Sequence, residues 1–426
     1  MIGRIKYLIQ SKTSKDLGIV LVENIISKII RLILIVLVAR VLGPEKYGIY
    51  SLITVSILFL SLFFDFGLEN PAVRFSVKLP DERDKIFGFY TLFKSIILTI
   101  FVLLLLIYPR FIEVLLNKSD IRKYLIIICL GCLIESYQYI ITTYFQSLEK
   151  FSTRAAINVG VDFLRLLLIL ILFKLDQFKV IYISYVFAIA GIPVLIIYTK
   201  KIFRFIQSIS IDVHTKKLLK NILDYSQWLV LGALAMNLMT RLDFYFVTST
   251  LGFSEAGLYN SAIQLVAPLM IIRMVVGKVF LPKISKLSNL DQIKKYISKV
   301  IKVGVIIILF IAIIFIFAKF IILIVFGNQY LNSLWVYRIL LISYLITLFN
   351  VLLTLVFYSL GYSKYVALGA YVQVFFFIIF SLYLIPKWGM EGAALSRLIA
   401  TISSLGVTIF FIKNKIYKSD TKILAI

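Results

Sequence analysis

The sequence predicts an all-α polytopic membrane protein with about twelve transmembrane helices in two six-helix lobes. Three observations support this fold class. Hydrophobic residues make up 61% of the chain, and its mean hydropathy is +0.99. Apolar stretches recur along the whole length at about the 20 residues that a helix needs to cross a bilayer core of roughly 30 Å. A short glycine-containing pattern also occurs in both halves of the chain.

The apolar stretches are continuously apolar over helical length, which favours helices over the alternating strands of a membrane barrel. The connections 40–47, 250–256 and 386–390 are short and carry Gly, Pro or charged residues, so consecutive helices are expected to run antiparallel. We place the spans near residues 19–39, 48–69, 86–108, 123–146, 155–173, 180–199, 223–249, 257–281, 302–326, 334–358, 364–385 and 391–412.

The glycine pattern Leu-Gly-x-x-x-x-Gly-x-Tyr occupies residues 42–50 and again residues 251–259. A second pattern, Phe-x-Ser-Leu, occurs at residues 145–148 and 357–360, with nearly the same separation. Two matches at one offset predict that the second half of the chain structurally repeats the first. In a membrane protein, such a repeat is typical of alternating-access transporters with a binding site between two lobes.

The repeat divides the chain into an N-terminal lobe, residues 1–206, and a C-terminal lobe, residues 207–426. Each lobe holds six predicted spans, so both begin in the same orientation and the repeat is parallel. The net charge is +25. The two termini and the even-numbered connections carry about three times as many Lys and Arg residues as the odd-numbered ones, which predicts that both termini are cytoplasmic. This distribution favours contact with anionic lipid headgroups rather than with nucleic acid.

Ionisable side chains inside a membrane are costly and tend to face water, a partner or a substrate. The first span carries the polar residues Glu23, Asn24, Ser27, Lys28 and Arg31 on adjoining helical positions, a stripe about 12 Å long. One explanation is a structural ion pair between Glu23 and either Lys28 or Arg31. Five polar groups exceed what one such pair needs, so we favour a stripe that lines a water-filled cavity.

The seventh and eighth spans carry a comparable set of polar residues. Asn237 and Arg241 share a face of the seventh span, which also contains Gln227 and Asp243, and Gln264 and Arg273 lie in the eighth. Arg273 is equally consistent with a side chain that extends to the cytoplasmic interface. Polar groups on the first helix of each lobe are the pattern that a central cavity requires.

The second span ends with an acidic pair, Asp65 and Glu69, which is expected to pair with Arg74 or Lys78 and to act as a gate or hinge or as a helix terminus. In the fifth span, Asp162 and Arg165 are three residues apart and are expected to satisfy one another. Basic residues outnumber acidic ones within the predicted spans, which favours an anionic ligand. Arginine suits this role because its planar guanidinium binds phosphate or carboxylate oxygens with two parallel hydrogen bonds.

Other chemistries lack support in the sequence. No phosphate-binding loop of the G-x-x-x-x-G-K-[ST] type occurs, so the chain is not expected to hydrolyse ATP. Cys129 and Cys132 lie within an apolar helix without further ligands, and we interpret them as packing residues rather than as a metal or redox site. We therefore expect no catalytic site, no metal site and no cofactor. The energy for transport is expected from an ion gradient, from the membrane potential or from consumption of the substrate outside.

Several segments resemble one known family, in order along nearly the whole chain. They include Ala-Arg-Val-Leu-Gly-Pro-Glu-Lys-Tyr-Gly at residues 39–48, Phe-Asp-Phe-Gly-Leu at 64–68, and Leu-Pro-Lys-Ile-Ser at 281–285. The stretches 241–259, 326–330 and 385–394 agree as well. On these residues the chain resembles the bacterial polysaccharide flippases of the multidrug/oligosaccharidyl-lipid/polysaccharide exporter superfamily.

The resemblance implies a V-shaped pair of helical bundles around a cationic cavity in the bacterial cytoplasmic membrane. It implies transfer of undecaprenyl-diphosphate-linked sugar units from the inner to the outer leaflet, in contact with a polymerase and glycosyltransferases. The expected diphosphate ligands are Arg31, Arg241, Lys28 and Arg273. The expected sugar ligands are Asn24, Gln227, Asn237 and Gln264, and the expected coupling or gate residues are Glu23, Asp65 and Asp243.

The related lipid II flippases carry a cavity arginine on the second span, and this chain has none before Arg74. An O-antigen, capsule or exopolysaccharide repeat is therefore the favoured cargo. A cation-coupled multidrug exporter of the same superfamily is one alternative, and it predicts an acidic cavity. A scaffold that docks polysaccharide enzymes without transport is another, and it predicts that cavity arginines are dispensable.

Overall fold

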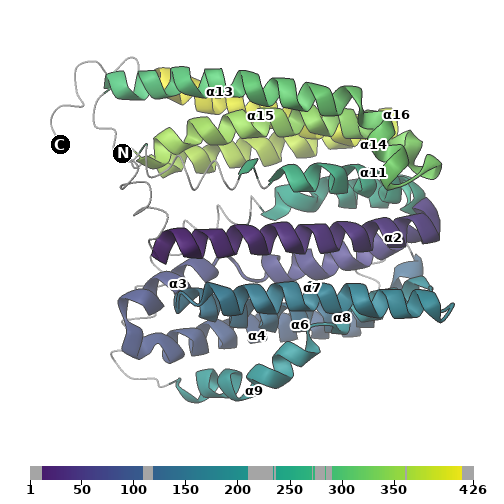
Figure 1. The fold of residues 1–426 in the computed structure, drawn as a ribbon, viewed down its shortest axis with the longest axis vertical. Coiled ribbons are helices and arrows are strands. Elements are labelled where there is room, and N and C mark those ends of the chain that lie inside the picture. Colours follow the sequence, from purple (N-terminus) through teal and green to yellow (C-terminus); the bar gives the residue numbers. More distant parts are fainter. Residues whose placement is uncertain are drawn as a thin grey trace. The chain divides into compact units, whose positions relative to one another are not determined.

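The computed structural model describes residues 12–108, 119–209, 234, 237–270, 272–273, 284, 290–359 and 362–414 (Figure 1). Helices make up nearly all of these residues, and no β-strand occurs among them. Six described helices are long and apolar enough to cross a membrane, and a bent pair, Ile307–Ile316 with Ala318–Val325, adds a seventh if it forms one span. The predicted all-α polytopic membrane fold is confirmed, while the count of twelve spans and the two-lobe repeat stay predictions.

The described chain forms two compact units. Unit 1 comprises Met1–Leu42 and Ile49–Asn237, and unit 2 comprises Gly43–Gly48 and Leu238–Ile426. The predicted lobe boundary at residue 206 stays a prediction, because residues 210–233 beside it lie outside the described ranges.

Unit 1 contains seven described helices. They are α2 (Lys12–Phe63, with its segment Gly43–Gly48 in unit 2), α3 (Glu69–Lys78), α4 (Arg83–Ile107), α6 (Leu125–Ser147), α7 (Phe151–Lys174), α8 (Val180–Ile189) and α9 (Ile192–Gln207). Short 3₁₀ turns at Pro80–Glu82 and Ser119–Tyr124 precede α4 and α6. Aromatic packing joins three of the helices, since the rings of Phe87, Tyr144 and Phe205 lie 5.0 to 5.6 Å apart in a buried cluster.

The helices of unit 2 include two that form its main packed pair, α15 (Leu334–Ser359) and α16 (Ser363–Ile412). The others are α11 (Phe253–Val266), α13 (Leu290–Ile316) and α14 (Ala318–Val325), with 3₁₀ turns at Ala267–Leu269 and Asn328–Ser333. Leu352 and Phe357 of α15, together with Ile412 of α16, belong to one buried apolar cluster.

Two helices are too long to be single spans. At 1.5 Å per residue, the 52 residues of α2 and the 50 residues of α16 would each extend about 75 Å, more than twice the bilayer core. Each helix breaks near its middle. In α2 the break is Gly43, whose φ of 74° is a left-handed value that glycine adopts without strain, followed by Pro44. In α16 the break lies at Trp388 and Gly389, where φ of Gly389 is 57°.

The two copies of the glycine pattern adopt the same conformation and contact each other within unit 2. Gly252, which matches Gly43, also has a positive φ, 99°, and is followed directly by a helix. A Cβ atom on Gly48 would collide with the carbonyl oxygen of Phe253, and one on Gly257 would collide with the carbonyl oxygen of Pro44. Each contact is the counterpart of the other in the two patterns. Glycine is therefore required at residues 48 and 257 by close backbone packing, which explains the spacing that the sequence repeats.

Candidate functional site

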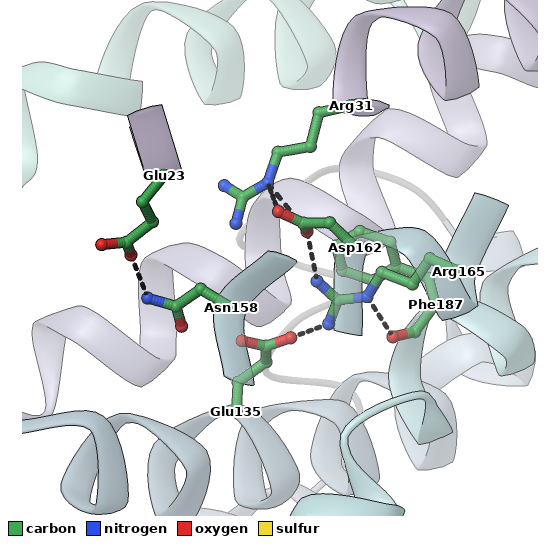
Figure 2. Close-up of polar contacts among 7 residues, drawn as sticks. All are labelled: Glu23, Arg31, Glu135, Asn158, Asp162, Arg165 and Phe187. Atoms are coloured by element: carbon green, nitrogen blue, oxygen red, sulfur yellow. Dashed lines mark hydrogen bonds and ion pairs between the residues drawn. The ribbon is translucent and has the colours of Figure 1, made fainter. Parts of the chain in front are cut away.

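Charged side chains from three helices of unit 1 and a carbonyl group from a fourth form a polar network (Figure 2). Arg31, Asp162, Arg165 and Glu135 are linked in a chain of contacts, and Glu23 and Asn158 form a separate pair beside it. Glu23 and Arg31 come from α2, Asn158, Asp162 and Arg165 from α7, Glu135 from α6, and the carbonyl group of Phe187 from α8. Asn158, Asp162 and Arg165 are spaced four and three residues apart, so they share the face of α7 that meets the other helices.

Arg31 and Asp162 form the link between α2 and α7. The Nε atom of Arg31 donates to both carboxylate oxygens of Asp162, at 2.9 and 2.8 Å. The Asp162 side chain is 1% exposed, whereas that of Arg31 is 52% exposed. Among the described residues, the two terminal nitrogens of Arg31 have no hydrogen-bond partner, and Figure 2 shows them on the side away from Arg165. These donors are the part of the guanidinium that a ligand can use.

Arg165 holds Asp162 from the other side. Its Nη1 atom lies 3.6 Å from Asp162, which confirms the expected pair, and its Nη2 atom is in contact with Glu135. Its Nε atom donates to the carbonyl oxygen of Phe187 at 3.2 Å, and the guanidinium lies 4.0 Å from the centre of the Phe187 ring. The buried Arg165 is thus fixed on four sides, as a charge in a low-dielectric interior must be.

Glu23 does not pair with Arg31, so that version of the structural ion pair is wrong. Its Oε1 atom accepts a hydrogen bond of 2.6 Å from the amide of Asn158. Its Oε2 atom is buried and has no hydrogen-bond partner within the described part of the chain. Glu23 therefore lacks the guanidinium that the other two acids of the network have, and its second oxygen remains available to a proton or a cation.

The positions of the charges, rather than their sum, determine which charge a ligand meets at this site. The three acidic residues of the network, Glu23, Asp162 and Glu135, outnumber its two arginines, and Lys28 on α2 brings the formal sum to zero. The acids are nevertheless buried or nearly so, and the half-exposed group is Arg31. An approaching ligand therefore meets a positive charge first, with its counter-charge behind it.

Arg31 does not lie on the apolar exposed face of its helix. The side chains of Ile29 and Ile33 are exposed on α2, and each is two residues from Arg31. Two residues correspond to about 200° of rotation, so Arg31 points away from that face. Asn24 and Lys28 flank Arg31 and are half-buried. The amide nitrogen of Asn24 donates one hydrogen bond to the carbonyl oxygen of Val20 at 2.7 Å, which leaves its second N–H and its carbonyl oxygen for a ligand.

Asp65 belongs to a second buried cluster of unit 1. Its partner is Lys94, at 3.3 Å, rather than Arg74 or Lys78, so the expected pairing was wrong. Asp65 also accepts a hydrogen bond from the Tyr90 hydroxyl and one of 3.2 Å from the backbone N–H of Glu69, at the start of α3. These contacts fix the turn between α2 and α3, as expected of a helix terminus.

In unit 2, Asp243 is the centre of a compact polar cluster. It accepts hydrogen bonds from the Arg397 guanidinium, from the Tyr259 hydroxyl at 2.8 Å and from the backbone N–H of Phe244 at 2.9 Å. Arg397 also donates through Nη2 to the carbonyl oxygen of Met239, at 3.0 Å. Both terminal nitrogens of Arg397 are thus occupied by the protein.

The other predicted ligands of the second half are less fully defined. Arg241 is two residues from Asp243, and its Nη1 atom is buried without a hydrogen-bond partner among the described residues. Asn237, Gln264 and Arg273 are half-buried in unit 2 or next to it, and Gln227 lies outside the described residues. Which of these side chains share one cavity with Arg31 stays a prediction.

Asn158 and Tyr259 are site residues that the sequence alone did not single out. Asn158 falls on the same face of α7 as Asp162 and Arg165, so helical spacing carried a signal for it. Tyr259 is the last residue of the glycine pattern, where its apolar neighbours concealed its polar role. No group of three or more potential metal ligands occurs in the described ranges, and Cys129 and Cys132 are both buried and unpaired as a disulfide.

Comparison with known proteins identifies the family. Residues 14–288, more than half of the chain, match the family described as polysaccharide biosynthesis protein. The chain therefore belongs to that family, and the resemblance to the polysaccharide flippases is confirmed. A candidate O-antigen transporter of Shigella flexneri is 23% identical over 397 residues, which cover 85% of this chain and 89% of the relative.

Solved structures show the same fold. The lipid II flippase MurJ in an inward closed conformation matches with a TM-score of 0.73 at 17% identity, over 92% of this chain and 87% of that one. An inward-facing multidrug resistance transporter of the MATE family matches with a TM-score of 0.72 at 16% identity, over 93% and 96%. The MATE transporter is a member of the multidrug/oligosaccharidyl-lipid/polysaccharide exporter superfamily. Both likenesses show that this multi-pass membrane protein shares their fold.

Proposed function

We propose that this protein translocates undecaprenyl-diphosphate-linked oligosaccharide units from the inner to the outer leaflet of the bacterial cytoplasmic membrane. The cargo would supply surface polysaccharide synthesis, as the family and the name of the Shigella flexneri relative suggest. Transport would proceed by alternating access around a cavity that receives the diphosphate.

The proposal rests on one observation, the exposure of Arg31 and the contacts of its guanidinium. A half-exposed guanidinium with two open terminal nitrogens stands in front of buried acids, on a helix whose apolar exposed face lies elsewhere. Two parallel N–H donors fit the oxygens of a phosphate group, and arginine keeps its charge in such a site. The Arg31 fork is therefore assigned to the diphosphate, with Arg241, Lys28 and Arg273 as further ligands.

The neutral polar residues are assigned to the sugar. Asn24, Gln227, Asn237 and Gln264 offer amide donors and acceptors, which match the hydroxyl groups of an oligosaccharide. Undecaprenyl tails would stay in the lipid while the polar head crosses. Both termini are placed in the cytoplasm from the charge distribution, and a polymerase, glycosyltransferases and anionic lipids are the proposed partners.

Coupling to an ion gradient is assigned to Glu23 rather than to Asp65 or Asp243. Asp65 and Asp243 each have a cationic partner, Lys94 and Arg397 respectively. Glu23 has an amide partner and a buried, unpartnered oxygen within the described chain. Uptake of a proton or a cation there would complete its interactions, so Glu23→Gln is expected to remove the dependence of transport on the ion gradient.

Genetic complementation tests the proposed function. In a host that lacks the gene and has no redundant flippase, undecaprenyl-diphosphate-linked oligosaccharide is quantified by mass spectrometry together with surface polysaccharide. Accumulated lipid-linked units and lost surface polymer, both reversed by a plasmid copy, are the expected result. Unchanged levels of both would contradict lipid-linked cargo.

Cation-coupled multidrug export is a second candidate function. The free oxygen of Glu23 favours it, because a buried carboxylate is the group that would bind a cationic drug or a coupling cation. The nearby Arg31 opposes a cationic ligand, which is why we rank this function second. A panel of cationic dyes and antibiotics separates the two: raised resistance on expression supports export, and unchanged resistance opposes it.

A further inference from the structure

We propose that Asp162 is the positioning residue of the anion-binding Arg31, held in place by Arg165 and Glu135. This inference rests on the proposed function, because it assigns Arg31 to a diphosphate. It adds residues of α7 and α6 to the site, behind the group that touches the ligand.

The geometry of the first contact fixes the direction of the guanidinium. Both oxygens of Asp162 accept from the Nε atom of Arg31, at 2.9 and 2.8 Å, and from no other nitrogen of that side chain. A guanidinium is planar, so a partner at Nε also sets where the two terminal nitrogens point. A pair formed through the terminal nitrogens would have consumed the donors that a phosphate needs. The observed contact orients the fork and leaves it open (Figure 2).

The contact between Asp162 and Arg165 explains how an acidic residue can lie beside a site that binds an anion. Asp162 is buried, and Nη1 of Arg165 lies 3.6 Å from it. The charge of Arg165 offsets that of Asp162, and Arg165 is offset in turn by Glu135. A buried charge without such a partner would cost several kcal/mol. The two arginines and two acids of this linked set sum to zero, and Arg31 is its exposed member, so the ligand meets the positive charge first.

The contacts of Arg165 with α6 and α8 make the arrangement rigid. Arg165 is fixed by Glu135 from α6 and by the carbonyl oxygen and ring of Phe187 from α8. Its position therefore does not depend on Arg31 or on a ligand. Asp162 receives a fixed orientation from the packed helices and transmits it to a long side chain that would otherwise lose rotamer entropy on binding.

Two variants at residue 162 separate positioning from charge. Asp162→Ala removes both the charge and the contact to Nε, whereas Asp162→Asn removes the charge but keeps an oxygen acceptor of the same shape. If Asp162 acted only through its charge, both variants would bind an anion more tightly, because each removes a negative charge near the site. If it positions Arg31, Asp162→Ala weakens binding and Asp162→Asn largely preserves it.

The experiment measures binding of undecaprenyl diphosphate to the full-length protein in nanodiscs, with inorganic pyrophosphate as the headgroup alone. We expect Asp162→Ala to weaken lipid binding about tenfold and Asp162→Asn to stay within about threefold. We expect no further loss when Asp162→Ala is added to Arg31→Ala, since both remove one interaction. Competition by pyrophosphate shows that the headgroup is what the site binds.

Each outcome is decisive. If Arg31→Ala weakens binding and Asp162→Ala does not, the positioning role is wrong and the proposed function stands. If Arg31→Ala itself leaves binding unchanged, the proposed diphosphate site is wrong. Should Asp162→Ala fail to fold, Asp162→Ser provides the same comparison, because its hydroxyl is too short to reproduce the double contact with Nε.

Discussion

Within the described residues, two arginine–aspartate pairs join helices that are distant in sequence, and they use the guanidinium in opposite ways. In unit 1, Arg31 contacts Asp162 through Nε alone, and its side chain is 52% exposed. In unit 2, Arg397 contacts Asp243 and the carbonyl oxygen of Met239 through its two terminal nitrogens, and its side chain is 20% exposed. The first pair leaves donors for a ligand, while the second uses them to hold the protein together.

Charge and location in the membrane are therefore not enough to identify an arginine that binds a ligand. Both arginines are costly in a membrane and both have a buried acidic partner. What distinguishes them is which nitrogen the protein occupies. We therefore assign Arg31 to ligand binding and Arg397 to structure, and the two assignments predict different losses on substitution.

The largest expected effect on stability comes from Arg397→Ala. It leaves Asp243 buried with only Tyr259 and a backbone N–H as partners. Removing one member of a buried ion pair costs about 3–5 kcal/mol, so we expect a strongly lowered Tm and little folded protein. The double variant Asp243→Asn/Arg397→Met should recover most of the Tm. A double variant as unstable as the single one would show that the pair is not what holds these helices.

The largest expected effect on transport without unfolding comes from Arg31→Ala. Asp162 keeps Arg165 as its partner, so the Tm should fall far less than in Arg397→Ala. Transport should fall more than tenfold, and Arg31→Lys should recover part of it as a point charge without the fork. Lys174→Ala, which removes an exposed charge at the end of α7, is the matched control. Equal transport in Arg31→Ala and Lys174→Ala would contradict the assignment.

Glu23→Gln should have an intermediate effect. The amide retains an oxygen for Asn158, so the Tm should change little. If Glu23 binds the coupling ion, transport should lose its response to the ion gradient while ligand binding at Arg31 persists. The measurement is transport in proteoliposomes at several imposed gradients. A lowered Tm with an unchanged gradient response would assign Glu23 to structure instead.

The smallest expected effect concerns Glu255, at the start of α11 outside the predicted spans. Partial burial, together with the like charge of Glu391, raises the pKa of Glu255 above its ordinary value. The folded state then favours the protonated form, so the ionised carboxylate is destabilising at neutral pH. Glu255→Gln should raise the Tm slightly at pH 7.5, and the gain should vanish below the ordinary glutamate pKa of about 4.3. A gain that persists at pH 3.5 would rule out this cause.

The helical fold could be predicted from the sequence because its signal is local. A run of about 20 apolar residues is enough to predict a membrane helix, and the breaks at Gly43 and Gly389 fall within the predicted connections 40–47 and 386–390. Asp162 and Arg165 could be paired because they are one helical turn apart.

Partners from different helices could not be predicted in this way. Arg31 and Asp162 are 131 residues apart, and Lys94 is 29 residues from Asp65, so only the packing of helices brings them together. The expected contacts of Glu23 with Arg31 and of Asp65 with Arg74 or Lys78 were wrong because side chains from other helices, Asn158 and Lys94, take their place. Helix packing also decides which guanidinium nitrogens of Arg31 and Arg397 the protein occupies, and this decides the role of each arginine.

Whether the Arg31 fork binds the transported diphosphate is tested most directly by comparing Arg31→Ala with Lys174→Ala in a host that lacks the gene. Lipid-linked oligosaccharide and surface polysaccharide are measured in both strains, at matched membrane levels of folded protein. We predict that Arg31→Ala accumulates the lipid-linked unit and loses surface polymer, while Lys174→Ala matches the unmodified protein. Normal surface polymer with no accumulation in the Arg31→Ala strain would contradict the claim that the Arg31 fork binds the transported diphosphate.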